Sequence, residues 1–570
     1  MASLTDHPPT ERGGWWHQYV CPAHGVELDH VGFETGEFPA GGVPCAYGCR
    51  VDTDAVRGAW RVLAHHWWAR RIRLLSYDGG GAELLTSYAR LYLELTKAGE
   101  HEQAQGWMQR GRLFHQALTD AVWGVPIAHA IRNLAGRAEL AETLPMLDDM
   151  VDGARRARDA MVAQDKFSSN YTAWFNALGT TAGQAAAAVR GERWDGEKEW
   201  LTGEHGQFAH LEVATGEDGW EWEASTYYHG FVLRAYLLSL RGADPAQVPD
   251  RLETMIAALA GIATDGGILP ALHDGPYRRV PLALEWLEIV ALARQFTASH
   301  GLDAVAAHAR AEVGPEYDGL EDRFGGWFAG PPRAAGSVRS LAITSSYAVI
   351  RAGGIHAILD HGAHGGSHGH HDKLALYLYG KTTPWQPDPG QVPYGHALWR
   401  RHYKSAAAHP TIRIDGLEPD EATGTLRRHE SSVTAEVNGW YEGVQATRQV
   451  IAGDNYLVDV VHVTADRERE IVLQFRPDVD LSVDIRPGAV HTTWVGDETL
   501  YGYHVGPGVP VTSPGPGPAD DPQRVRTALD WTVVGTAATF CSVYSMTAVA
   551  VELTGDAVAV DGYIHRIGER

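Results

Sequence analysis

Cysteine is scarce in this sequence. Four cysteines occur in 570 residues, too few for a scaffold stabilised by disulfides. No segment approaches the roughly 20 consecutive apolar residues that a membrane span requires. The first residues also lack the basic and apolar regions of a secretory signal. We therefore expect a soluble protein that stays in the cytoplasm.

Positive charge is also sparse. The 48 lysines and arginines are outnumbered by 71 aspartates and glutamates, which gives a formal net charge of −23. Such a charge repels nucleic acid and anionic membrane surfaces at long range, so we expect neither as a partner. The 19 tryptophans and 22 tyrosines suit the apolar faces of sugar rings, although most aromatic rings pack in a protein core.

Three of the cysteines gather near the N-terminus. Cys21 stands three residues before His24, and Cys45 stands four residues before Cys49. Three thiols and one imidazole in two short clusters can form a tetrahedral structural zinc site. The other interpretation is free cysteines in an irregular segment, because the CxxxC spacing is looser than the usual CxxC. Cys541, alone in a strand-like run, is predicted to be a small core residue.

Hydrophobic spacing divides the rest of the chain. Residues 54–320 carry apolar side chains at intervals of three and four, as in 56–75, which predicts a series of helical hairpins. From about residue 340 the period changes to two, which predicts antiparallel strands stacked in sheets. The fold class is therefore α+β multidomain: an irregular N-terminal segment (1–53), an incomplete α/α toroid (54–320) and an antiparallel β-sandwich (321–570). Within the sandwich we expect a surface loop at 506–522.

The densest chemical signal is a histidine-rich run in the strand region. Five imidazoles separated mainly by glycines lie close together, at His361, His364, His368, His370 and His371. Histidine titrates near neutral pH and is the commonest metal ligand, so this run predicts catalysis or metal binding. The other interpretation is a flexible polar loop.

A zinc site can be assembled from this run and two residues that follow it. Asp388 lies in a turn between prolines, and His409 stands just before a predicted strand. With His370 they offer two imidazoles and one carboxylate, which suit zinc with a water as fourth ligand. Taken alone, Asp388 is also explained by turn chemistry and His409 by a place at a strand edge.

These residues carry a resemblance to a known family. The run HGAHGGSHGHHDKLALYLYGK, followed by RRHYKSAAAHPTIRIDG, resembles the heparinase II/III-like C-terminal module. That family includes heparin, heparan sulfate and alginate lyases, built from an α/α toroid and an antiparallel β-sandwich. The resemblance implies that His368 is catalytic and that His370, Asp388 and His409 bind a structural zinc. The sequence departs from the family at two positions. His371 stands where a small residue is usual, and Pro410 directly follows His409.

Two segments of the helical half extend the resemblance. Residues 169–174 resemble the family's helix start, whose asparagine holds the uronate carboxylate; Asn170 is the matching residue, and Tyr171 stands where several relatives have a catalytic histidine. Residues 218–229 resemble the family's DGxxxExSxxYH segment, which implies that Tyr228 is a catalytic acid or base, with Tyr227 as the second choice. Alone, Asn170 would be explained as a helix N-cap. We further expect substrate contacts from residues in or beside the quoted segments: Tyr227, His229, His364, Arg400, Glu223 and Trp174.

The resemblance implies a carbon–oxygen lyase that cleaves an acidic oligo- or polysaccharide by β-elimination at a uronic acid. The lack of an export signal favours oligosaccharides cut from one end, but the sequence does not decide between endo and exo action. Neutralising the uronate carboxylate would stabilise the enolate-like transition state, and an acid and a base would move the protons. The sequence leaves open whether Tyr228 or His368 is the base, which uronic acid is cut, and whether the protein is a homodimer. No organic cofactor is expected.

Two other functions were weighed. A glycoside hydrolase would need a pair of carboxylates, for which Asp218, Glu221 and Glu223 are candidates, but it leaves the histidine-rich run unexplained. A non-catalytic carbohydrate-binding protein would have no need of Tyr228 or His368. Fold analogy alone does not decide among these functions.

Overall fold

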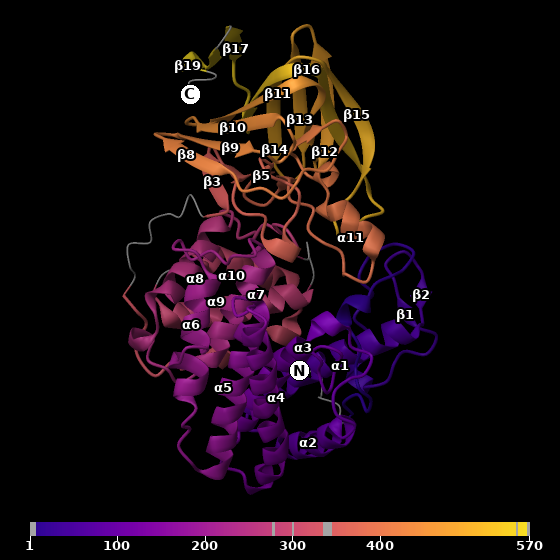
Figure 1. Ribbon diagram of the computed structural model, residues 1–570, viewed down its shortest axis with the longest axis vertical. Helices are drawn as coiled ribbons and strands as arrows, with labels where there is room; N and C mark the ends of the chain where they lie inside the picture. The colour runs from indigo at the N-terminus through magenta and orange to yellow at the C-terminus, as the bar shows by residue number, and fades with distance from the viewer. Residues whose placement is uncertain (1–6, 276–279, 299–300, 335–344, 555–556, 567–570) are drawn as a thin grey trace.

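The computed structural model describes residues 7–275, 280–298, 301–334, 345–554 and 557–566. Helices fill the first part of the chain and strands fill the second (Figure 1), which confirms the predicted order of toroid and sandwich. The helices are α1 (Asp54–Tyr77), α2 (Ala82–Thr96), α3 (Ala117–Asn133), α4 (Leu144–Ala163), α5 (Asn170–Arg190), α6 (Gln207–Ala214), α7 (Thr226–Ser239), α8 (Asp250–Ile262), α9 (Val280–Phe296), α10 (Asp303–Glu312) and α11 (Ala397–Lys404).

The strands form antiparallel sheets, and all but β1 and β2 come after helix α10 in the chain. They are β1 (Val43–Pro44), β2 (Arg50–Val51), β3 (Tyr347–Ala352), β4 (Ile355–Asp360), β5 (Leu376–Tyr379), β6 (Pro384–Gln386), β7 (Ile412–Ile414), β8 (Thr425–His429), β9 (Ser432–Asn438), β10 (Val444–Ala452), β11 (Tyr456–Phe475), β12 (Asp480–Arg486), β13 (Ala489–Val495), β14 (Thr499–Val505), β15 (Val509–Pro516), β16 (Val525–Ser545), β17 (Val551–Thr554), β18 (Ala557–Val560) and β19 (Tyr563–Arg566).

The odd-numbered helices form the inner wall of the toroid. Helices α1, α3, α5, α7 and α9 pack against one another in succession, and the even-numbered helices return the chain outside them. Buried ion pairs join the two ends of this series. Glu288 of α9 pairs with Arg73 of α1, and its other oxygen accepts a 2.6 Å hydrogen bond from Arg234 of α7. A buried charge is stable only when it is paired, so these pairs hold the first and last inner helices together.

The sandwich consists of a ten-stranded sheet and a four-stranded sheet in the order β3-β4-β5-β6. The smaller sheet is covered on both faces. Alternate residues such as Ala348 and Ile350 pack into the sandwich core, whereas Tyr347 and Val349 pack against Trp220 and other side chains of the helical half. Strands covered on both faces have continuous apolar sequences, and every residue of β4 and β5 is buried. This sheet fixes the position of the toroid relative to the sandwich.

The prediction of a surface loop at 506–522 is wrong for the central part of this segment. Residues Val509–Pro516 form strand β15, which pairs with the long strand β16 along its whole length. The glycines and prolines in this segment suggested a loop. An edge strand tolerates proline, because the N–H that proline lacks can face away from the neighbouring strand.

The N-terminal segment, described from residue 7 to 53, has little regular structure. It contains one pair of two-residue strands and short 3-10 turns. It lies beside α1 and below α11 (Figure 1), and its apolar residues pack with Trp60 of α1. Among the described residues, no helix is both long and apolar enough to cross a membrane.

One buried ion pair links the large sheet to the loops of the smaller one. Arg448 of β10 donates to both oxygens of Asp459 of β11, at 2.8 and 2.7 Å. Its remaining N–H groups donate to the carbonyl oxygens of Leu374 and Pro410, which flank the histidine-rich run and His409 in the sequence.

Replacing this arginine should destabilise the protein strongly. Arg448→Met would leave the Asp459 carboxylate buried without a partner, so we expect the free energy of unfolding to fall by about 3–5 kcal/mol, measured by urea unfolding. Arg427→Met is the matched control: its pair with Glu436 on the same sheet is exposed and should be worth less than about 1 kcal/mol. Equal losses in the two variants would contradict the role of the buried pair.

Candidate active site

A cavity of about 520 Å³ lies where the toroid, the sandwich and the N-terminal segment meet. All three predicted catalytic residues line it: Asn170, Tyr228 and His368. Of the predicted substrate-binding residues, Tyr227, Glu223 and Arg400 line it as well.

The other three predicted substrate contacts do not line this cavity. Trp174 is fully buried and packs against Phe231. His229 is also buried, and both of its ring nitrogens are engaged by backbone groups, the amide of residue 221 and the carbonyl of residue 255. His364 pairs with Glu421 at 3.5 Å. None of these three side chains lines the cavity, so the structure gives no support to their predicted roles in substrate binding.

Two serine caps aim the helical residues into the cavity. Ser169 caps α5, so Asn170 is the first residue of the helix and its side chain is free for another partner. Its amide nitrogen donates to both oxygens of Glu223, at 2.9 and 3.2 Å. Its amide oxygen has no hydrogen-bond partner among the described residues. Ser225 caps α7 and thereby places Tyr228 in the first turn of that helix.

The histidine-rich run brings His368 against Tyr228. Their rings stack with centroids 3.7 Å apart, and His368 Nε2 lies 3.6 Å from an oxygen of Glu223. Gly365 allows this approach, since a Cβ at that position would meet the backbone oxygen of Glu223 at 2.3 Å. The Tyr228 hydroxyl lies 2.9 Å from that of Tyr394.

Asp274 organises the polar groups around the cavity. One of its oxygens accepts hydrogen bonds from His368 Nδ1 at 3.0 Å and from the Tyr394 hydroxyl at 2.8 Å, and lies 3.3 Å from the guanidinium of Arg400. The other accepts from His370 Nε2 at 3.1 Å. Burial alone would raise the pKa of Asp274, but these hydrogen bonds and the nearby cations hold it well below its usual value.

Sequence reasoning missed Asp274 and Tyr394. Both stand in short segments with glycine and proline, His-Asp-Gly-Pro and Pro-Tyr-Gly, which indicate turns and nothing more. For Tyr394 the sequence offered one indication of a functional role, its position between Asp388 and Arg400, which were both predicted site residues. Asp274 has no such neighbour.

The backbone before Asp274 is held in an unusual conformation. His273 has φ of 59°, which is strained for a residue with a side chain. Its imidazole lies 3.3 Å from both Asp360 and Asp372. Burial alone would lower the pKa of His273, but the two carboxylates outweigh it and raise the pKa to about 10. Lys373 also pairs with Asp360, so the two carboxylates face protein groups that can carry positive charge.

Only one of the three carboxylates considered for a hydrolase lines the cavity. Glu223 lines it. Asp218 instead accepts hydrogen bonds from the backbone amides of Trp220, in the turn before α7, and of Ser345. Glu221 is buried behind Glu223, and one of its oxygens accepts a hydrogen bond from the Glu223 amide. Burial raises the pKa of Glu223, and burial together with the neighbouring Glu223 raises that of Glu221. This arrangement gives no support to the hydrolase alternative based on Asp218.

The predicted metal ligands His370, Asp388 and His409 meet beside the cavity, and all are fully buried. His370 donates through Nε2 to Asp274, and His409 donates through Nδ1 to the carbonyl oxygen of Ser405 at 2.8 Å. These bonds leave His370 Nδ1 and His409 Nε2 with lone pairs that face each other at 3.1 Å. An oxygen of Asp388 lies 4.0 and 3.8 Å from them. Two nitrogen lone pairs and a carboxylate that face one point fit a cation, and the outer hydrogen bonds are those that orient metal-binding histidines.

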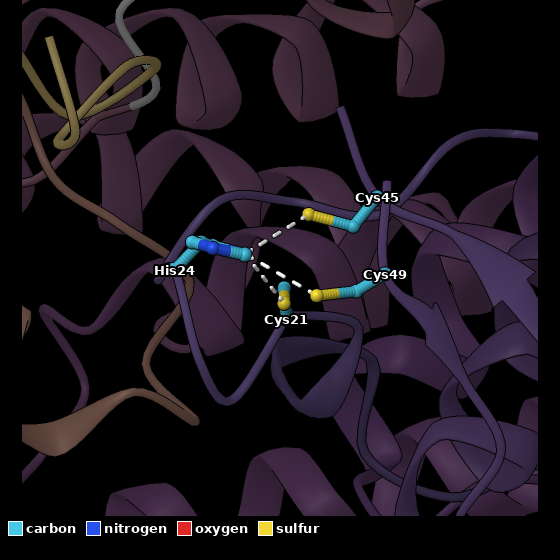
Figure 2. Close-up of side chains that lie close together, drawn as sticks. All are labelled: Cys21, His24, Cys45 and Cys49. Carbon is cyan, nitrogen blue, oxygen red and sulfur yellow. Dashed lines mark hydrogen bonds between the residues drawn. The ribbon is translucent and has the colours of Figure 1, made fainter. Parts of the chain in front are cut away.

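The second predicted group also comes together. Cys21, His24, Cys45 and Cys49 place their ligand atoms within 4.8 Å of one another in the N-terminal segment, and their side chains face one another (Figure 2).

Comparison with known proteins agrees with this geometry. Residues 339–536 match the family model described as heparinase II/III-like, C-terminal. The C-terminal part of the chain is a heparinase II/III-like domain. The resemblance predicted from the histidine-rich run is confirmed.

Solved structures share the fold of this chain beyond that domain. The heparan sulfate lyase HepC from Pedobacter heparinus is 14% identical and has a TM-score of 0.57, over 91% of this chain and 83% of its own. The heparinase III from the BT4657 gene is 13% identical with a TM-score of 0.60, over 95% and 92%. At these identities the likeness establishes the shared toroid-plus-sandwich fold. No curated protein matches the sequence significantly.

The metal-binding geometry makes a prediction about composition. His409→Ala removes one of three ligands, so the zinc-loaded protein should lose about one metal ion per chain after dialysis, measured by plasma mass spectrometry. His462→Ala, which replaces a histidine paired with Thr539 on the large sheet, should keep the metal content of the parent. Unchanged metal in His409→Ala would show that these three residues are not a metal site.

Proposed function

We propose that this protein is a polysaccharide lyase that cleaves a uronic-acid-containing glycan by β-elimination. One observation carries the proposal: Asn170, Tyr228 and His368, from two helices and the histidine-rich run, line a single cavity. The fold shared with a heparan sulfate lyase and with heparinase III supports the same class of reaction. The cavity is large enough for sugar units, and its aromatic side chains, such as Trp16 and Trp67, suit the faces of sugar rings.

The reaction removes the proton from C5 of the uronate and breaks the bond between C4 and the leaving oxygen. The electron pair of the C5–H bond becomes a C4–C5 double bond, and the leaving oxygen takes up a proton. The C5 proton is weakly acidic while the neighbouring carboxylate is charged. Hydrogen bonds to that carboxylate stabilise the negative charge that develops on it in the transition state.

Asn170 and Glu223 are placed to bind this carboxylate. Burial raises the pKa of Glu223, which favours the protonated form of a carboxyl that faces the cavity, and a protonated carboxyl can donate a hydrogen bond. The Asn170 amide lies beside it. Arg400 of α11, one-quarter exposed, adds positive charge to the cavity, and its guanidinium lies 3.7 Å from the centre of the Tyr394 ring.

His368 is the better base and Tyr228 the better acid. His368 donates from Nδ1 to Asp274, which leaves the Nε2 lone pair for the C5 proton, and the carboxylate stabilises the imidazolium that forms. Burial raises the pKa of Tyr228 well above its usual value, so its hydroxyl is protonated before the reaction and can protonate the leaving oxygen. A zinc held by His370, Asp388 and His409 would have a structural role. Those residues would fix the run that carries His368, because His368 and His370 share Asp274.

The N-terminal segment limits one side of the cavity with Trp15, Trp16 and His17. A wall of this kind shortens the binding groove, which supports action on oligosaccharides from one end.

Absorbance of the new double bond tests the proposal directly. With a panel of uronate oligosaccharides, the parent should produce ultraviolet absorbance, and Tyr228→Phe and His368→Ala should each lower kcat/KM by about 10²–10⁴-fold. Tyr501→Phe, on the large sheet far from the cavity in the sequence and fold, is the control and should behave as the parent does. Reducing ends without absorbance would indicate hydrolysis, and binding without any product would indicate a carbohydrate-binding protein.

The raised pKa of Glu223 predicts a pH dependence. The protonated donor is present below that pKa and is lost as the pH rises through it, so kcat/KM should fall on the alkaline side. Glu223→Gln keeps an N–H donor that does not titrate, so its alkaline fall should move to higher pH or vanish. The measurement is the pH profile of kcat/KM for both proteins. Identical alkaline limbs would exclude Glu223 as the titrating donor.

A further inference from the structure

The cysteine group of the N-terminal segment has the geometry of a closed metal site. His24 Nδ1 lies 3.4 Å from the sulfur of Cys21, 3.6 Å from that of Cys45 and 3.5 Å from that of Cys49. All four side chains point toward a common centre (Figure 2). Tetrahedral zinc, with bonds of about 2.3 Å to sulfur and about 2.0–2.1 Å to nitrogen, would separate these atoms by about 3.6 Å.

Core packing does not account for this convergence. Cys541 shows the arrangement of a packing cysteine, since it lies in a strand among apolar neighbours such as Val460 and Val543. The three N-terminal sulfurs instead surround one imidazole nitrogen, and Cys21 and Cys45 are almost fully buried. A single disulfide would use only two of the three thiols and would leave the histidine without a role.

The backbone holds the four ligands in two tight turns. The amide of Gly25 donates to the carbonyl of Cys21 at 2.8 Å, and the amide of Gly48 donates to that of Cys45 at 2.9 Å. Gly48 has φ of +83° with open space around it, so it is the backbone conformation that favours glycine there. The amide of Cys45 donates in turn to the carbonyl of Cys49. These bonds bring the two pairs of ligands together.

We propose that Cys21, His24, Cys45 and Cys49 bind one structural zinc ion. Four protein ligands close the coordination sphere, as in structural zinc sites, and leave no position for a substrate. The thiols bind as thiolates, so their protons are released to solvent when the metal binds.

The ion would stabilise a segment that joins both halves of the protein. Gln523 of the sandwich donates to the carbonyl oxygen of His24 at 3.2 Å, and His396, at the start of α11, donates to that of Pro22 at 3.2 Å. A few residues earlier in the chain, His17 stacks on Tyr394 with ring centroids 4.0 Å apart. The segment has almost no regular secondary structure of its own, so a cross-link between its two turns supplies order that hydrogen bonding does not.

This site therefore acts on the cavity through the wall that the segment forms. That consequence rests on the proposed lyase function, because the segment contributes His17 and its neighbours to the cavity where the sugar would bind. The residues of the zinc site are positioning residues and do not contact the substrate.

Metal content tests the site without reference to activity. Cys45→Ser and Cys49→Ser should each hold about one zinc fewer per chain than the parent, measured by plasma mass spectrometry on protein purified without chelator. Cys541→Ala is the control and should keep the zinc of the parent. Zinc content equal to the parent in both serine variants would overturn the proposal.

Cobalt substitution tests the same site in the parent chain, and so does not depend on the folding of a variant. Thiolate ligands give cobalt(II) an intense charge-transfer absorption in the near ultraviolet, which nitrogen and oxygen ligands do not. The cobalt-loaded parent and His409→Ala should both show this band, because the site that contains His409 has no sulfur ligand. Absence of the band, or a disulfide between two of the three cysteines found by mass spectrometry, would also overturn the proposal.

Limited proteolysis separates this inference from the lyase proposal. Loss of the N-terminal zinc in Cys45→Ser should speed cleavage within residues 7–53 relative to the parent and leave the rates in the toroid and sandwich unchanged. A protein with zinc and a protected segment but no lyase activity would support the site and refute the proposed reaction. Lyase activity in a protein that binds no zinc in this segment would support the proposed reaction and refute the zinc site.

Discussion

The buried carboxylate of Asp274 is the interaction on which the cavity depends. A charge in this position is stable only when donors surround it, and the donors come from the histidine-rich run, the loop with Tyr394 and the start of α11. Its own backbone is fixed by a hydrogen bond from Ser225, the cap of α7. One residue thus contacts a candidate base and a candidate metal ligand through its side chain, and the cap of the helix that presents Tyr228 through its backbone.

Periodicity was enough to predict the order and class of the two halves. Apolar side chains recur at intervals of three and four residues where one face of a helix is buried. This pattern predicted α1 from its first residues. Alternation marked β3, although β4 and β5 are buried on both faces and show nearly continuous apolar runs instead. The segment of β15 was misjudged because glycine and proline counted as turn residues, whereas the pairing that makes it a strand is with β16, which lies later in the chain. Contacts between distant residues leave no local pattern.

The site residues could be predicted where several of them lie in one short segment with a recognisable sequence motif. His368, Tyr228, Asn170 and the three metal ligands each lie in a segment with a recognisable pattern, and the structure brings each set together. His229 and Trp174 share those segments but point away from the cavity, because adjacent positions on a helix face different directions. Asp274 and Tyr394 could not be found, since their importance comes from partners far away in the sequence.

The smaller sheet of the sandwich has a consequence for how the chain can be divided. Its outer face is covered by Trp220, Leu272 and other side chains of the helical half, so a fragment that began near β3 would expose a continuous apolar surface to water. Exposed patches of this kind promote self-association. The heparinase II/III-like domain in this chain therefore depends on the helical half to cover one of its apolar faces. Gene fusions or truncations that keep it would need to keep the helices that shield it.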